Sequence, residues 1–314
     1  MPRYLLARFV QALALVVVVS IVMFTMIAAA PGGPAILVQE DVSAEAAAAM
    51  RRNLGLDDPI PVQYWRWASR MVSGDLGVSL SNSRQVSTLL GQRFGSTATL
   101  AVTALLLSIV VAIPIGILSA VHRNGWFDRI ATVIAFVGVS IPNFWLGIMM
   151  IIFFSVTLGW LPSGGTGASG DVALVERLRH LIMPAVVLGT ATMAQLTRYT
   201  RSSMIGVLRQ DYVRTARAKG VPERVVLSRH ALRNGLIPVI TVIGVLLPRL
   251  LSGAAITESI FAWPGLGRLA VDSALQRDYP VIMALTLLIS VLVICASFVV
   301  DLLYVVVDPR IRYD

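Results

Sequence analysis

Charge is scarce in this chain of 314 residues, and lysine is almost absent. Only 14% of the residues are charged, whereas a soluble domain of ordinary composition carries about 25%. Lys219 is the single lysine, and it follows Ala218. A phosphate-binding P-loop needs a lysine directly after a glycine. The sequence therefore excludes ATP hydrolysis by that motif.

Cysteine and histidine are scarce as well. Cys295 is the single cysteine and lies in an apolar run, so no internal disulfide can form. The three histidines, His122, His180 and His230, fall far apart at the ends of apolar segments or between them. This spacing predicts no metal cluster inside a membrane and no pair of nucleophile and base. Both observations argue against a membrane-embedded enzyme.

Hydrophobic residues are in excess, at 56% of the chain, and the mean hydropathy is +0.78. A helix of about 20 apolar residues crosses the hydrocarbon core of a bilayer. Six segments have about this length and composition. They are 9–30, 97–121, 130–158, 181–205, 236–258 and 280–307. The sequence therefore predicts an all-α membrane protein with six transmembrane helices.

The first of these segments has a second interpretation. The three alanines at 28–30 resemble the small-residue cleavage site of a signal peptide. However, the apolar run is longer than the hydrophobic region of a signal peptide, and Pro31 would directly follow the cut. We therefore expect a retained helix.

Basic residues in the short loops predict the orientation of the chain. The stretch 198–233 holds nine arginine or lysine residues against two acidic ones, and the turn at 122–129 is also basic. Six spans with both termini in the cytoplasm place all of this charge on the cytoplasmic side. The loops at 31–95, 159–180 and 259–279 then face outward.

The predicted organisation has four parts. They are an N-terminal transmembrane helix at 1–30, an extracytoplasmic loop at 31–95, a five-helix core at 96–307 and a cytoplasmic tail at 308–314. Capping residues and apolar periodicity predict three short helices within the outer loop, at 43–55, 59–74 and 86–94, the last of them lying in the membrane interface. The loop could be a capping subdomain or a landing surface for an extracytoplasmic partner, and both interpretations stay open.

The core contains one large cytoplasmic loop, at about 207–234. Residues 208–219 suit a short helix, Gly220 can take the positive φ of a helix end, and Pro222 can open a second helix that runs to about 233. A helix, a glycine turn and a helix form a compact projection that another protein can grip, and we call residues 207–234 the knob. Composition alone leaves a solvated basic loop without a partner equally open.

The knob carries a specific resemblance. Its sequence DYVRTARAKG at 211–220, followed by RHALRN at 229–234 and by Ile237-Pro238, resembles the EAA loop of ABC importer permeases in the form found in oligopeptide and dipeptide permeases. Further similar elements occur in the same order along 1–314. They are GDLG at 74–77, SIPNFWLG at 140–147, LGWLP at 158–162, ESIFAWPGLGR at 258–268, RDYP at 277–280, DLLY at 301–304 and DPRIRY at 308–313.

Two positions depart from the family pattern. The general EAA motif begins with glutamate where this chain has Arg214, a variation that the dipeptide-type proteins share. Pro248 and Arg249 fall where small residues are expected.

The resemblance implies the fold of a type I ABC importer permease in the cytoplasmic (inner) membrane of a bacterium. It implies as partners a second related permease, two ATPase subunits that bind ATP and Mg, an extracytoplasmic substrate-binding protein and a peptide substrate. No cofactor is expected on this chain. The residues that would couple the knob to an ATPase are Asp211, Tyr212, Arg214, Thr215, Ala216, Arg217, Ala218, Lys219, Gly220 and Glu223.

Polar groups inside the spans are candidates for the translocation path, because in lipid they are costly and usually face protein or water. The candidates are Asn143, Thr192, Gln195, Arg198 and Arg249. Arg249 could pair with a peptide carboxylate in transit. The alternatives are that it pairs with an acidic residue of the partner permease or extends toward the outer interface.

Two other functions stay open at this point. A nickel-chelate importer uses a similar permease, and the sequence does not separate it from an importer of dipeptides or oligopeptides. A secondary carrier is the more distant alternative, because it needs coupling-ion acids inside its spans. Apart from Glu258 at the last position of the span 236–258, Asp301 is the single acidic residue within a predicted span, and it lies near the end of that span.

Overall fold

The computed structural model of the protein describes residues 2–30, 45, 49, 52, 55–167 and 174–307. Within these residues the regular structure is helical, apart from one isolated antiparallel bridge between Val78 and Gln85. The predicted tail at 308–314 and the first of the three predicted short helices lie largely or wholly outside the described residues. The all-α prediction is thus confirmed for the part of the chain that is described.

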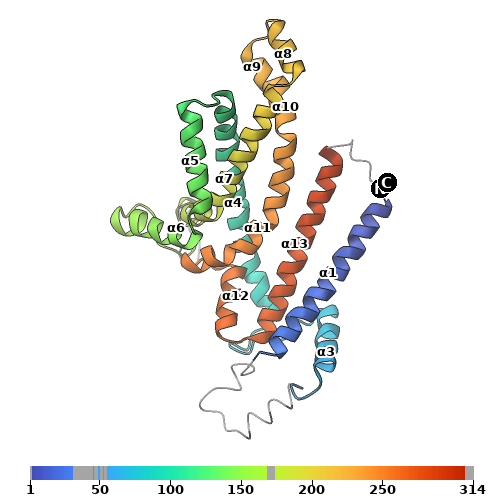
Figure 1. Cartoon of the computed structure of the whole chain (residues 1–314). Helices are drawn as coiled ribbons and strands as arrows, with labels where there is room; N and C mark the ends of the chain where they lie inside the picture. The colour runs from blue at the N-terminus through green and yellow to red at the C-terminus, as the bar shows by residue number, and fades with distance from the viewer. Residues whose placement is uncertain are drawn as a thin grey trace. The chain divides into compact units, whose positions relative to one another are not determined.

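Among the described residues, four helices are long and apolar enough to cross a membrane as continuous spans. They are α1 (Pro2–Ala28), α4 (Val86–Val121), α7 (Leu174–Leu208) and α13 (Tyr279–Val307), labelled in Figure 1. α4 has 36 residues because it starts earlier than expected. The predicted separate helix in the membrane interface at 86–94 was wrong, since these residues are the first turns of α4.

The third predicted span is not one continuous helix, which corrects that prediction. α5 (Trp126–Ser140) ends before a second helix made of α6 (Asn143–Met150) and the π-helical segment η2 (Ile151–Thr157), and the two helices are bent by 104°. Pro142 causes the break. It has no N–H to donate, and it keeps the preceding residue extended, with ψ 124° at Ile141.

α11 (Ile237–Ile260) follows the knob and is one helix of 24 residues, and its first part, Ile237–Leu246, is apolar. The described residues therefore support four membrane spans, or five if the bent pair is one span. The total of six stays a prediction.

The described chain forms two compact units. The first consists of Met1–Thr97 and Pro264–Ile294, and it includes α3 (Ile60–Val72) and α12 (Leu266–Leu275). Its core contains the buried residues Val86, Leu89, Leu90, Leu266, Leu269, Val281, Ala284 and Leu285.

Within the same unit, α1 and α3 pack through aromatic side chains. The ring of Phe24 lies 5.6 Å from that of Tyr64 and 5.5 Å from that of Trp67, centroid to centroid. The hydroxyl of Ser20 is 2.9 Å from the hydroxyl of Tyr64. The second of the predicted short helices, at 59–74, is thus confirmed as α3 and is fixed against the N-terminal helix.

The second unit consists of Ala98–Trp263 and Cys295–Asp314. In it α4, α5, α7 and α11 pack together, and small residues allow close approach. A Cβ atom on Gly116 of α4 would lie 2.6 Å from the Cβ of Thr200 on α7, and one on Gly189 of α7 would lie 3.0 Å from the Ala104 carbonyl oxygen of α4. The backbones of α4 and α7 are therefore nearly in contact at two levels.

Candidate functional site

The knob is helical, and it projects from the ends of α7 and α11 in Figure 1. Its helices are α8 (Asp211–Ala218), α9 (Glu223–Val225), the π-helical segment η3 (Val226–Ala231) and α10 (Leu232–Gly235). The predicted order of helix, glycine turn and second helix is therefore confirmed. The π-helical middle of the second helix was not foreseen.

The turn between the two helices forms around Gly220, which has φ +74°. The N–H of Gly220 donates to the Arg217 carbonyl at 2.9 Å, and the N–H of Val221 donates to the Ala216 carbonyl at 3.2 Å. This pair of bonds is a Schellman motif, which satisfies the last carbonyls of a helix. Pro222 then caps the next helix with φ −54° and ψ 137°. Local sequence alone thus accounts for the turn.

The two helices of the knob share a small apolar core. Val213 and Val226 are fully buried and Ala216 is 8% exposed, with Val207 and Val221 packed against them. Small or β-branched side chains at these positions let α8 lie close to η3. The knob is therefore a folded element with its own core.

An ion pair also joins the two helices across the turn. The Arg217 guanidinium donates to the Glu223 carboxylate at 2.6 and 3.1 Å. These hydrogen bonds lower the pKa of Glu223 and raise the pKa of Arg217. Both side chains are about half exposed, at 52% and 41%, so solvent screens much of the attraction.

Polar contacts hold the knob together and tie its end to α7. The Asn234 side chain donates to the Tyr212 hydroxyl at 3.0 Å, and the Ser203 hydroxyl of α7 donates to the Gly235 carbonyl at 2.7 Å. Gly235 lies so close to Met204 that a Cβ there would be 2.5 Å from the sulfur. The end of the knob therefore packs directly against α7.

Of the ten predicted coupling residues, nine are exposed on the knob and Ala216 is buried inside it. The surface residues form one contiguous stretch around α8 and the glycine turn. Sequence reasoning missed the residues that hold this surface in place. They are Val213, Val226, Asn234 and Gly235. The apolar i, i+3 spacing of positions 213 and 216 was the one signal that could have indicated the buried face.

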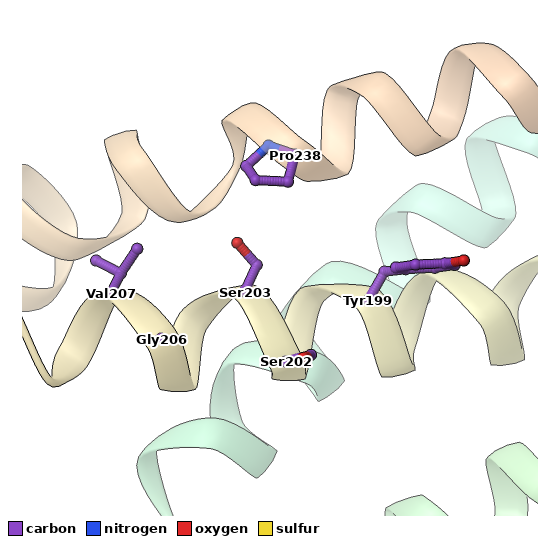
Figure 2. Close-up of a pocket in the computed structure, with 6 residues that line it drawn as sticks. All are labelled: Tyr199, Ser202, Ser203, Gly206, Val207 and Pro238. Atoms are coloured by element: carbon purple, nitrogen blue, oxygen red, sulfur yellow. The ribbon is translucent and has the colours of Figure 1, made fainter.

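An open pocket of about 330 Å³ lies beside the knob, between α7 and the start of α11. Figure 2 shows the Ser203 side chain directed across the groove toward Pro238. The lining residues are Tyr199, Ser202, Ser203, Gly206, Val207 and Pro238. None of these six residues is charged, so the pocket offers shape and hydroxyl groups without an ionic contact.

The candidate residues of the translocation path lie in different surroundings. Thr192 of α7 is buried, at 6% exposed, and Gln195 is half-buried. Arg198 is exposed, and its guanidinium carbon lies 4.8 Å from the centroid of the Phe136 ring of α5. This distance is within the range of a cation–π contact. The described structure thus places Arg198 and Gln195 on or near the surface of α7.

The other two path candidates lie elsewhere. Asn143 is half-buried and is the first residue of α6, just after the break at Pro142. Arg249 belongs to α11, and its side chain lies outside what the structure describes.

A buried carboxylate near the knob end of α7 was not foreseen. Asp128, in the first turn of α5, is 3% exposed and accepts hydrogen bonds from Arg201 of α7 at 2.5 and 2.8 Å. It also accepts bonds from the Ser119 hydroxyl of α4 and, at 2.9 Å, from the backbone N–H of Asn124. One side chain thus joins three helices.

The described residues contain no group of three or more histidine, cysteine, aspartate or glutamate side chains that could hold a metal ion. The long apolar helices instead define a multi-pass helical membrane protein. Its fold is shared with a membrane chain in a structure entitled "Inward facing conformations of the MetNI methionine ABC transporter". The TM-score is 0.58 at 20% identity, over 71% of this chain and 97% of that one.

Two family descriptions together match nearly the whole chain. "Binding-protein-dependent transport system inner membrane component" matches residues 112–313, and the N-terminal description of the same kind of membrane component matches residues 1–101. The chain belongs to this family of inner membrane transport components. It is therefore a non-catalytic, multi-pass subunit of a transport system in the inner membrane.

Full-length relatives support the assignment. The chain is 44% identical over 316 residues to the oligopeptide transport system permease protein AppB of Bacillus subtilis, and 100% of both chains is covered. It is 41% identical over 314 residues to the glutathione transport system permease protein GsiC of Escherichia coli, again over 100% of both chains.

Proposed function

We propose that the chain is one permease subunit of an ATP-driven importer that moves peptides across the cytoplasmic membrane. The observation that carries the proposal is the knob, a folded projection with an exposed surface around α8, a hydrogen bond between its two helices and a hydrogen bond from its end to α7. A solvated loop without a partner needs neither a core nor a fixed attachment. The knob is thus a contact surface for an ATPase subunit.

ATP hydrolysis is coupled to transport because the ATPase contacts the knob differently in its different nucleotide states. An ATPase that grips the knob differently in its ATP-bound and ATP-free states shifts the membrane helices between outward- and inward-facing arrangements. The force reaches α7 because Ser203 and Met204 contact Gly235 directly. The chain supplies the path and the contact surface, and ATP and Mg bind to the partner subunits.

The complete importer contains this chain, a second related permease, two ATPase subunits and an extracytoplasmic binding protein. In this assembly six spans place both termini and the knob in the cytoplasm. α11 is the fifth of these spans, between the knob and the segment Phe261–Pro264. The orientation rests on the basic residues of the knob, which favour the cytoplasmic side.

The names of the relatives support a peptide-like substrate. The Bacillus subtilis relative is named for oligopeptides, and the Escherichia coli relative for glutathione, which is itself a tripeptide. A nickel chelate is the alternative substrate, and a secondary carrier is the alternative mechanism. A substrate carboxylate in transit is a partner for a basic residue of the path, and Arg249 is our candidate. If Arg249→Gln left both uptake and substrate preference unchanged, this role would be excluded.

The proposal is tested by extracting the tagged chain from its native membrane in mild detergent and identifying the proteins that co-purify. We expect a second permease of similar size, one or two ATPases with P-loops, and a binding protein that retains tri-alanine or glutathione. A binding protein that retains nickel and no peptide would favour the chelate importer. A homo-oligomer that stays intact without any ATPase would favour the carrier.

A further inference from the structure

The Asp128 carboxylate accepts a set of hydrogen bonds that is more specific than helix packing alone requires. Its two carboxylate oxygens accept hydrogen bonds from the Nε and Nη2 groups of Arg201 in a bidentate pair, at 2.5 and 2.8 Å. They also accept hydrogen bonds from the Ser119 hydroxyl and from the N–H of Asn124. Asn124 has φ +63°, so the turn between α4 and α5 is shaped to direct its N–H at the carboxylate. All four donors converge on one buried group.

The location of this cluster relates it to the knob. Arg201 lies seven residues before the end of α7 at Leu208, about 10 Å along the helix axis. On the next turn of α7, Met204 packs with Ala120 of α4 and Ala231 of the knob. The Asp128 cluster therefore joins the α4–α5 hairpin to α7 beside the point where the knob is attached.

A bidentate buried pair fixes relative position better than apolar packing does. Apolar side chains can slide past one another at small cost, whereas shifting the Arg201 guanidinium breaks its hydrogen bonds to a carboxylate that is only 3% exposed. Such a pair contributes little to net stability, because desolvation offsets the attraction. Fixed geometry is thus the effect that distinguishes it from an apolar contact.

We propose that Asp128 and Arg201 act as positioning residues, forming a clamp that makes the knob, α7 and the α4–α5 hairpin move as one rigid body. The motion that an ATPase imposes on the knob then reaches α4 and α5 without loss. Without the clamp, the last turns of α7 would move with the knob and the α4–α5 hairpin would not follow them. The inference rests on the proposed function, because it needs an ATPase that moves the knob.

The test compares variants in the complete importer, reconstituted in vesicles with tri-alanine and glutathione as transport probes. Asp128→Asn or Arg201→Gln alone leaves an unmatched partner in a buried site, so either single variant can fail to fold. The double variant Asp128→Asn with Arg201→Gln removes both charges together, so no charged group is left without its partner, and it is the informative one. Arg129→Gln is the matched control, since Arg129 is the exposed neighbour of Asp128 on α5.

We expect the double variant to hydrolyse ATP at a rate within about twofold of the parent, while the ATP used per probe transported rises about fivefold. Arg201→Lys should give an intermediate ratio, because lysine keeps the charge and loses the bidentate geometry. Arg129→Gln should keep the ratio of the parent. A double variant with the ratio of the parent would reduce the clamp to a structural contact and overturn the inference.

A second measurement follows the rigid body itself. Spin labels at Ile130 of α5 and Ser228 of the knob, both exposed, are introduced together with Cys295→Ser. The distance between the labels should be the same with and without ATP in the parent and should depend on ATP in the double variant. If the parent protein hydrolyses ATP and transports a probe while the distance between its labels changes, the clamp is contradicted and the proposed function is not. A parent that recovers no ATPase would remove the proposed function and the clamp together.

Discussion

The carboxylate of Asp278 accepts a hydrogen bond of 2.5 Å from the hydroxyl of Ser79, a residue 199 positions earlier in the chain. Asp278 is 1% exposed and Ser79 is 2% exposed. The same carboxylate also accepts bonds from the Ser81 hydroxyl at 2.8 Å and from the N–H groups of Leu80 and Ser81 at 3.1 and 3.3 Å. The turn between α12 and α13 is thereby fixed to the hairpin before α4.

We predict that Asp278→Ala lowers the free energy of unfolding by about 3 kcal/mol, because it leaves several buried donors without an acceptor. Thermal unfolding of the purified chain in detergent measures the change. Asp272→Ala is the control, since its ion pair with Arg268 is 3.7 Å long and about half exposed, and pairs of that kind contribute at most about 1 kcal/mol. Equal midpoints for the two variants would contradict the prediction.

Gly220→Val should uncouple transport while the chain still inserts into the membrane. The backbone there has φ +74°, which costs a side-chain-bearing residue about 1–2 kcal/mol and a β-branched one more. No atom lies within 4 Å of an added Cβ, so conformation and not space sets the cost. Gly220→Asn should retain more uptake than the valine variant, because asparagine tolerates positive φ. Equal uptake in both variants would show that transport does not depend on a residue that tolerates positive φ at position 220.

Ala216→Glu should unfold the knob locally, because it forces a carboxylate into the core formed with Val213 and Val226. We expect rapid proteolysis within the knob and loss of uptake, with normal amounts of protein in the membrane. Ala218→Glu adds the same group to an exposed position of the same helix and should leave the knob resistant to protease. If both variants resisted protease equally, the small core would not hold the knob together.

The ion pair between Arg217 and Glu223 predicts a small pH dependence of knob order. Since the folded state lowers the pKa of Glu223, the stabilisation is complete above the ordinary glutamate pKa of about 4.3 and is lost as the pH falls below it. A spin label at Arg224 should therefore become more mobile below about pH 4. In Glu223→Gln the label should be mobile throughout and independent of pH. A label with the same pH response in both proteins would assign the effect to other groups.

Gly116→Ala should lower stability by about 1–3 kcal/mol, because its methyl group would force α4 away from α7. The added carbon would lie 2.6 Å from the Thr200 Cβ and 2.9 Å from the Thr197 carbonyl oxygen. Gly91 on the same helix has no atom within 4 Å of an added Cβ. Gly91→Ala should then be neutral, or stabilise by up to about 1 kcal/mol through helix propensity. Thermal unfolding of the two variants side by side decides, and a similar loss in both would refute the close contact.

Local chemistry was sufficient for much of the knob. The glycine turn, the proline cap and the helix on each side follow from φ preferences and missing donors within about a dozen residues. The same logic could have found the break at Pro142, because the residue before a proline avoids helical ψ. The apolar composition of 130–158 obscured that signal, since hydropathy reports burial and does not show where a helix changes direction.

Sequence by itself determined that this is a helical membrane protein with a helix–glycine–helix knob, because these properties depend on composition and on neighbours in the chain. Its motifs carried the resemblance to ABC importer permeases. Tertiary structure alone decided which polar groups meet. Asp128 with Arg201, and Asp278 with Ser79, are separated by 73 and 199 positions. No local preference brings such residues together. Their pairing follows from the packing of helices, and burial then requires each carboxylate to have donors.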